Sequence, residues 1–159
     1  KYLSKMYNDF WMMDQGFLER ESFGDLRDLI ARRHLDREDF TLSPDDDLQR
    51  AVNIMKLYDV SQIAVVERDR EGADHIVGIL DESDVLLAVT RDPEAFAKPV
   101  SEVMTRRLET IAPTARIEDL LPIFRADRVA IVEDEHGRYL GLITKIDLIN
   151  YLRRQLARS

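Results

Sequence analysis

The sequence contains no cysteine among its 159 residues. This absence excludes disulfide frameworks and thiolate metal sites, and it is consistent with the reducing cytosol, where we expect the protein to be. No apolar run approaches the ~18 residues that a membrane-spanning helix requires. Basic residues are outnumbered 23 to 31, giving a net charge of −8. Nucleic acid is therefore not expected as the main partner, because phosphate contacts need a basic face.

Signals of catalysis and of metal binding are also lacking. The three histidines, His34, His75 and His136, lie far apart without ligand spacing, so we interpret them as exposed loop residues. The acidic cluster Asp45–Asp47 suits the start of a helix better than general acid catalysis. The sequence contains no nucleophile elbow, Walker loop or dinucleotide fingerprint. We expect no catalytic residue, no metal site and no bound cofactor in this chain.

What is present is a pattern of apolar segments that occurs twice. Hydrophobic residues make up 45% and charged residues 34% of the chain, as in a globular protein. The recurring positions fall at offsets of 69, 66 and 63, which predicts two three-residue deletions in the second copy. The matched pairs are Leu42 and Pro44 with Ile111 and Pro113, Ile63–Val66 with Val129–Val132, and Gly78 and Asp84 with Gly141 and Asp147. Recurrence of every block in order indicates an internal repeat.

Each copy is expected to form the order β-α-β-β-α. In the first copy a helix opens at Asp45–Asp47, buried strands follow at Ile63–Val66 and Ile76–Leu80, and a second helix covers Ser83–Val89. Two strands are too little sheet to be stable alone. We therefore predict an α/β fold in which both repeats pack as one pseudo-twofold pair.

Two features modify this plan. Pro122 lies inside the helix expected at Ala115–Phe124 and should kink or shorten it. Ahead of the repeats we expect an N-terminal helical extension, with one helix at Asp25–His34. The predicted division is an N-terminal part over residues 1–38, a first repeat over 39–98 and a second over 99–159.

The chemistry is expected where each repeat passes from its last strand into its last helix. Gly141, Thr144 and Asp147 mark this junction in the second repeat, and Asp81 and Asp84 mark it in the first. Either pair of polar residues could simply be a capping box. The open helix N-terminus also offers N–H groups to an anion, and a carboxylate there suits the two hydroxyls of a ribose.

These residues resemble a tandem pair of cystathionine-β-synthase (CBS) domains, also called a Bateman module. The resemblance covers the repeats and rests on the signature Gly-h-h-Thr/Ser-x-x-Asp/Asn, in which h is an apolar residue. It implies that AMP, ADP, ATP or S-adenosylmethionine binds between the repeats, with the signature acid on the ribose. The ligand-binding residues that it implies are Ser43 and Pro44 near the adenine, Ser61, Gln62, Ile63 and Ala64 on the opposite wall, and Thr144, Lys145, Ile146 and Asp147.

The first repeat departs from the signature, because Asp81 occupies the hydroxyl position. At ~4 Å and an effective dielectric constant of about 20, two like charges repel by on the order of 4 kcal/mol. A phosphate is therefore disfavoured there. We predict a second, weaker cleft at Asp81 and Asp84, with Arg128 on its far wall.

Residues 1–12 resemble the end of the catalytic domain in cystathionine β-synthases, and the helix expected at Asp25–His34 resembles the linker that leads to their regulatory pair. That resemblance implies a parent enzyme that uses pyridoxal phosphate (PLP) to condense serine with homocysteine in transsulfuration. The Schiff-base lysine and phosphate loop of such an enzyme are absent, so this fragment should have no activity of its own. It would instead bind an adenosyl ligand, S-adenosylmethionine before AMP or ATP, and regulate a catalytic domain of the same chain.

A different function would be assembly without a ligand. The helices at Val85–Val89 and Leu148–Leu156 carry wider apolar arcs than one contact face requires. CBS pairs commonly dimerise through these helices, so the resemblance also implies a homodimer. A helix with one face on the sheet and the other on the N-terminal segment would have the same composition.

Overall fold

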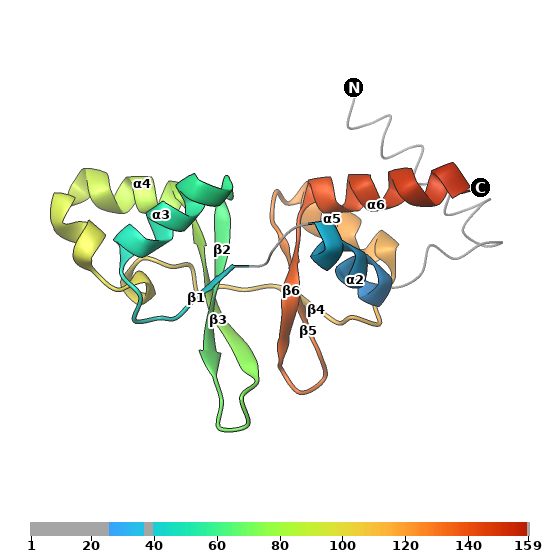
Figure 1. Ribbon diagram of the computed structural model, residues 1–159, viewed down its shortest axis with the longest axis horizontal. Coiled ribbons are helices and arrows are strands. Elements are labelled where there is room, and N and C mark those ends of the chain that lie inside the picture. Colours follow the sequence, from blue (N-terminus) through green and yellow to red (C-terminus); the bar gives the residue numbers. More distant parts are fainter. Residues whose placement is uncertain (1–25, 37–39, 159) are drawn as a thin grey trace.

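Two three-stranded sheets face each other across the centre of the molecule, and the helices lie on their outer sides (Figure 1). This computed structural model describes residues 26–36 and 40–158. The aromatic-rich N-terminal segment, on which the predicted cystathionine β-synthase parent depends, lies outside the described residues.

The first repeat forms the sheet β1-β2-β3, with β1 parallel to β2 and β2 antiparallel to β3. Two helices follow the expected order. The elements are β1 (Thr41–Leu42), α3 (Leu48–Tyr58), β2 (Gln62–Arg68), β3 (Asp74–Asp81) and α4 (Glu82–Arg91). The helix α3 begins where expected, because the Asp47 carboxylate accepts the Arg50 N–H at 2.8 Å.

The second repeat forms β4-β5-β6 with the same strand directions. Short 3-10 helices η2 (Pro93–Ala97) and η3 (Val100–Glu102) connect the two repeats. The remaining elements are β4 (Thr110–Ile111), η4 (Ile117–Asp119), α5 (Leu120–Arg125), β5 (Ala130–Glu133), β6 (Tyr139–Ile143) and α6 (Lys145–Arg158). The predicted α/β fold of two β-α-β-β-α repeats is confirmed.

Pro122 has the effect predicted for it. The first helix of the second repeat is divided into the 3-10 turn η4 and the six-residue helix α5, whereas α3 in the first repeat has 11 residues. A proline inside a helix removes one backbone donor and its ring crowds the preceding turn.

The predicted alignment of the two copies is wrong by one residue at the central strand. Val65 pairs with Gly78, and Val132 pairs with Gly141. Val65 therefore corresponds to Val132, an offset of 67 rather than 66. The second copy lacks two residues before this strand and four in the hairpin, not three and three. The error arises because the apolar residue Val129 lies just before β5 and extends the hydrophobic run by one residue at its start.

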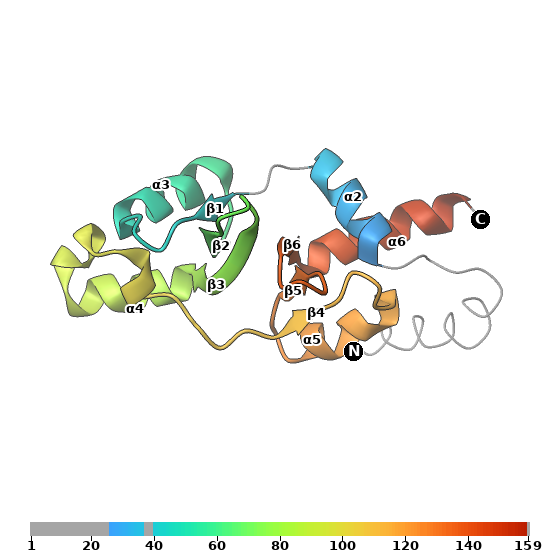
Figure 2. The ribbon, with the colours of Figure 1, turned by 90° about the horizontal axis from the view of Figure 1, so that it is seen from below.

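The segment before each repeat packs on the other repeat. The Leu26 N–H, at the start of α2 (Leu26–Asp36), donates to the Ala115 carbonyl at 3.3 Å. At the corresponding place in the first repeat, the Val100 N–H donates to the Asp46 carbonyl at 2.8 Å. The helix α2 thus takes the position in the second repeat that η3 takes in the first (Figure 2).

The contact of α2 with the second repeat is a hydrophobic core contact. Leu26, Leu29 and Ile30 are buried in one cluster with residues of α5, β5, β6 and α6. The Tyr151 hydroxyl on α6 also donates to the Asp28 carboxylate at 2.7 Å. The N-terminal helix is therefore structurally part of the second repeat, a relation that the predicted division at residue 38 does not express.

The two sheets meet in a small core of their own. Ala64 and Val66 from β2 are buried against Ile131 and Leu142 from β5 and β6. Alternate residues of β2 point to opposite faces, so Ile63 and Val65 instead belong to the core beneath α3 and α4. The continuous apolar run of β2 is explained by burial on both faces.

Gly78 is required by a close contact, which gives a testable prediction. A Cβ at this position would overlap the Met104 sulfur and lie 2.8 Å from its Cγ. Gly78→Ala should lower the free energy of unfolding by about 1–3 kcal/mol, because the buried methionine must move. Urea denaturation measures this change.

The paired variant Met104→Ala removes the obstacle. In that background, Gly78→Ala should cost clearly less than in the wild type, since residues in contact do not contribute additively. Equal costs in both backgrounds would show that Met104 is not the reason for the glycine.

Candidate functional site

The second-repeat junction holds its signature acid in a fixed orientation. The Asp147 Oδ2 accepts both the Thr144 N–H and the Thr144 hydroxyl, each at 2.9 Å. The threonine hydroxyl therefore donates to the carboxylate. Both side chains are half-buried. A carboxylate anchored through one oxygen at a helix start is arranged in advance for recognition of hydroxyl groups.

Gly141 shapes the strand before this helix. Its φ of 153° lies in a region that residues with a Cβ rarely adopt. The ladder shifts register between Val132 and Glu133, beside the Gly141 pair, and an equivalent shift lies between Val65 and Val66 in the first repeat. Such bulges bend a strand and redirect its end, so the signature glycine and the bulge together set the entry into α6.

Lys145 supplies a positive charge at the same junction. Its Nζ lies 2.9 Å from the Asp127 carboxylate, and Asp127 adopts the left-handed conformation with φ 58°. The hydrogen bond from Lys145 holds the pKa of the Asp127 carboxyl below its ordinary value. The pair is exposed, so water and salt weaken it. Ile146, the next residue, is also exposed.

The first-repeat junction has a complete capping box. The Asp81 Oδ1 accepts the Ser83 N–H at 2.7 Å, and the Asp81 N–H donates to the Asp84 Oδ2 at 3.2 Å. The other Asp81 oxygen accepts the Gln62 side-chain amide at 2.9 Å. The capping function that the sequence left open is therefore realised in this repeat.

Thr105 makes a contact at this junction that sequence reasoning missed. Its hydroxyl donates to the Asp84 Oδ2 at 3.4 Å. The connection between the repeats crosses β3 at this point, because Thr105 and Ile79 exchange two backbone hydrogen bonds of 2.9 and 3.0 Å. The Asp84 Oδ2 thus accepts two hydrogen bonds from the chain itself, as the Asp147 Oδ2 does at the other junction.

The hydrogen bonds of the predicted opposite wall stay within the first repeat, whereas Ala64 packs on the second. The Ser61 carbonyl accepts the Glu82 N–H at 2.9 Å, and Gln62 binds Asp81. Ile63 and Ala64 are buried, on opposite faces of β2. Their predicted approach to Thr144 stays a prediction.

The other predicted residues lie at the edges of the repeats. The Ser43 N–H donates to the Asp46 carboxylate at 2.8 Å, and the Pro44 carbonyl accepts the Ser101 N–H at 3.2 Å. Both thus sit at the start of α3, against η3. Arg128 is exposed and ion-paired with Glu109.

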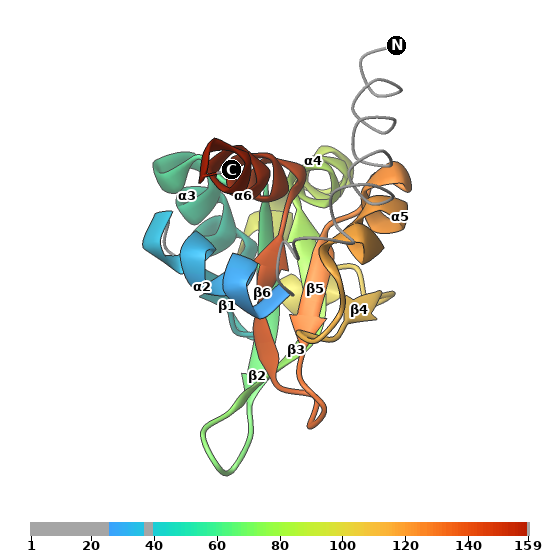
Figure 3. The ribbon, with the colours of Figure 1, turned by 90° about the vertical axis from the view of Figure 1, so that its right-hand side faces the viewer.

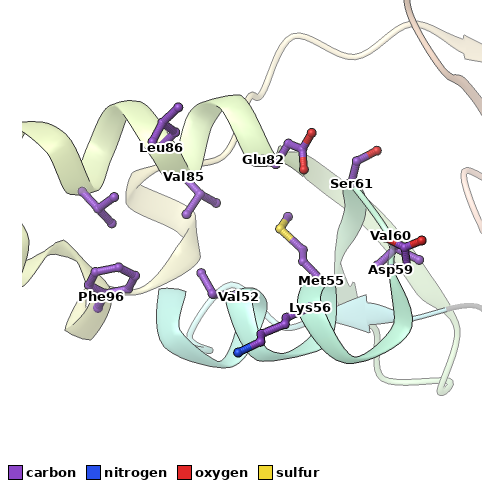
Figure 4. Close-up of a pocket in the computed structure, with 11 residues that line it drawn as sticks. Val52, Met55, Lys56, Asp59, Val60, Ser61, Glu82, Val85, Leu86 and Phe96 are labelled. Carbon is purple, nitrogen blue, oxygen red and sulfur yellow. The ribbon is translucent and has the colours of Figure 1, made fainter.

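A groove of about 620 Å³ lies between α3 and α4 (Figure 4). Its walls are mainly apolar, and Ser61 and Glu82 stand at one end. The apolar side chains are Val52, Met55, Val60, Val85, Leu86, Val89 and Phe96. None of the signature residues of the second repeat lines it.

Over the described ranges, 26–36 and 40–158, no group of His, Asp or Glu could hold a metal ion. None of the helices in these ranges combines the length and the apolar character that a membrane span needs.

Comparison with known families decides the assignment of the repeats. The family model described as the CBS domain matches residues 26–91 and again residues 100–154. The chain belongs to the CBS-domain family. The first match begins at α2 and the second at η3. Each matched CBS domain therefore includes the N-terminal segment that packs on the other repeat.

Curated relatives of this CBS pair belong to several protein classes. The chain is 32% identical over 113 residues to inosine-5′-monophosphate dehydrogenase of Aquifex aeolicus, covering 69% of this chain and 21% of that protein. It is 31% identical over 123 residues to the CBS domain-containing protein YhcV of Bacillus subtilis, covering 75% and 83%. It is 29% identical to the magnesium and cobalt efflux protein CorC of Escherichia coli, covering 80% and 41%. The chain therefore spans about a fifth of the dehydrogenase.

Solved structures share the fold of the CBS pair. The CBS-domain protein ATU1752 from Agrobacterium tumefaciens superposes with a TM-score of 0.67 at 23% identity, covering 84% of this chain and 96% of that one. A structure of CBSX2 in complex with AMP superposes with a TM-score of 0.66 at 16% identity, covering 82% and 97%.

Proposed function

We propose that this CBS pair binds an adenosyl ligand, such as AMP, ATP or S-adenosylmethionine, at the second-repeat junction and thereby regulates a neighbouring protein domain. The observation that carries the proposal is the Asp147 carboxylate, which Thr144 orients at the start of α6. Membership of the CBS family and the AMP complex of the structural neighbour CBSX2 support the ligand class.

The ligand would make two kinds of contact at this junction. Asp147 would accept hydrogen bonds from the ribose hydroxyls, and a phosphate would face the N-terminus of α6. Lys145 would leave its partner Asp127 and bind the phosphate instead. The loss would be small, because the Lys145–Asp127 ion pair is exposed and screened by water and salt. This charge arrangement favours an adenine nucleotide over S-adenosylmethionine, which carries a sulfonium cation instead of phosphate.

The first-repeat junction is the weaker site in this proposal. Asp81 binds Ser83 and Gln62, and Asp84 binds Thr105. A ligand would have to bring a phosphate toward the carboxylates of Asp81 and Glu82, where the second repeat has Thr144 and Lys145. Repulsion between like charges opposes that placement.

Regulation requires the ligand to bind two arrangements of the protein with different affinities. The predicted cystathionine β-synthase parent with its PLP cofactor has no support among the relatives named above, which are a dehydrogenase, an efflux protein and a CBS-domain protein.

A thermal-shift panel of AMP, ADP, ATP, S-adenosylmethionine and GTP tests the proposed function. A ligand at 100 times its dissociation constant should stabilise the fold by about 2.7 kcal/mol. We expect an upward shift for at least one adenosyl compound and a smaller shift for GTP. A flat response to the whole panel would instead favour a module that only assembles the protein.

We also expect the chain to form a homodimer through α4 and α6. Leu86 and Leu87 on α4 are 64% and 52% exposed, and Ile149 and Leu156 on α6 are 39% and 44% exposed. Apolar side chains gathered on the outer helices in this way favour a protein partner. Light scattering at tens of micromolar should give about twice the monomer mass of 18.5 kDa.

The control for the dimer separates this surface from a general effect of charge. Leu86→Glu should shift the protein to monomer, because a carboxylate would be buried at the interface. Arg70→Glu, on the exposed loop between β2 and β3, should leave the dimer intact. A wild-type chain of monomer mass would contradict the dimer.

A further inference from the structure

His75 joins the two repeats through both of its ring nitrogens. It lies at the start of β3, so its interpretation as a loop residue is wrong. Its side chain is 35% exposed. Its Nε2 lies 2.6 Å from the Asp69 carboxylate in the first hairpin, and its Nδ1 lies 2.8 Å from the Gly137 carbonyl oxygen in the second. Both hairpins extend toward the same end of the molecule (Figure 3).

Both partners of the ring are acceptors without a hydrogen. A carboxylate and a backbone carbonyl accept hydrogen bonds, so each ring nitrogen must donate. Neutral imidazole carries only one N–H, and only the protonated ring satisfies both partners at once. The hairpin contact therefore depends on the charge state of His75.

Backbone groups of the first hairpin hold the Asp69 carboxylate in place independently of the histidine. The other oxygen of Asp69 accepts the Glu71 N–H at 2.8 Å and the Ala73 N–H at 2.9 Å. The hydrogen bond with Asp69 raises the pKa of His75 above its ordinary value, and the same bond lowers the pKa of the Asp69 carboxyl.

The surrounding charges favour the protonated ring on balance. Glu67 lies opposite His75 in the β2–β3 ladder, and the charge of Glu133 on β5 further raises the pKa of His75. Two ion pairs flank the ring, Arg68 with Asp74 at 3.4 Å and Arg138 with Asp134 at 2.8 Å. The other charged groups of the hairpin loops, Arg70, Glu71 and Glu135, are exposed.

We propose that His75 is a proton-dependent clamp, which ties the hairpin of the second repeat to that of the first when the ring is protonated and releases it when the ring is neutral. The neutral ring keeps its proton toward the charged Asp69, so its Nδ1 lone pair then faces the Gly137 oxygen and that bond is lost. The clamp is fully formed below the ordinary histidine pKa of about 6.5 and is lost as the pH rises through the higher folded value.

NMR of the labelled full chain tests the clamp. The His75 ring should titrate with a midpoint above 6.5, with both nitrogens protonated below it, and the carbonyl carbon of Gly137 should shift with the same midpoint. Asp69→Asn should lower that midpoint. A His75 midpoint at or below 6.5, or a Gly137 carbonyl that does not follow it, would overturn the proposal.

Two variants assign the transition to the residue. His75→Gln cannot titrate and should abolish the Gly137 transition. His136→Gln changes the exposed neighbouring histidine, which pairs with Glu135 at 3.4 Å, and should leave the transition in place. A Gly137 transition that survives His75→Gln, or one that disappears in His136→Gln, would contradict the assignment.

Discussion

Replacing Asp147 by asparagine should lower the affinity for the adenosyl ligand at least tenfold. The variant keeps the size of the side chain and one acceptor oxygen, but it loses the charge that ribose hydroxyls would bind. Hydrogen bonds to charged groups contribute about 1.5–3 kcal/mol each, which is a tenfold effect or more for a single bond. Calorimetric titration of both proteins with the best ligand of the thermal-shift panel measures the ratio.

The stability of the same variant distinguishes binding from capping. Both bonds from Thr144 go to one oxygen of Asp147, and the asparagine amide oxygen can still accept them. Asp147→Asn without ligand should therefore cost no more than about 1 kcal/mol, the usual effect of a helix cap. If the variant binds the ligand normally but has a lower free energy of unfolding, Asp147 serves only as a helix cap.

Asp84→Asn is the matched control in the first repeat. Asp84 occupies the same position of the signature, but the acid Asp81 stands where the second repeat has Thr144 and would repel a phosphate. Its replacement should leave the main affinity nearly unchanged. Equal losses in the two variants would mean that both junctions bind ligand, and a loss only in Asp84→Asn would mean that the wrong junction was chosen.

Leu29→Ala should destabilise the protein by about 2–5 kcal/mol, although the residue precedes both predicted repeats. The Leu29 side chain is 1% exposed and belongs to the core formed by α5, β5, β6 and α6. Truncation would leave a cavity in the second repeat. Urea denaturation at constant protein concentration measures the change without interference from dimerisation.

The control is an equally large side chain in an exposed position. Leu57 on α3 is 74% exposed, so Leu57→Ala should change the free energy of unfolding by less than about 0.5 kcal/mol. A small effect at Leu29, comparable to that at Leu57, would show that α2 is a dispensable linker and not part of the core.

Local patterns in the sequence were sufficient for most of the elements. The apolar run at Ile63–Val66 predicted β2, and the signature from Gly141 to Asp147 predicted the end of β6 and the start of α6. Pro122 predicted the short helix of the second repeat because its effect depends only on its own ring. These features are decided within a few residues, where spacing and backbone chemistry are informative.

Long-range contacts could not be predicted in the same way. The packing of Leu26 near Ala115 joins positions that no local pattern relates. Thr105 on Asp84 depends on where the connection between the repeats crosses β3, and a single hydroxyl in a connector leaves no periodic signal. His75 was misjudged for a similar reason, since its partner Gly137 belongs to the other repeat.

The most direct test of the proposed site is to observe which backbone amides respond when the wild-type chain is titrated with AMP. Two-dimensional NMR should show the largest shifts at Thr144, Lys145, Ile146 and Asp147, with further shifts at residues 61–64 if these form the opposite wall as predicted. Glu82, Ser83 and Asp84 should respond only at much higher concentration, because the carboxylates of Asp81 and Glu82 repel a phosphate there. Shifts confined to residues 82–84, or no shifts in either junction with any adenosyl compound of the panel, would contradict the proposed site.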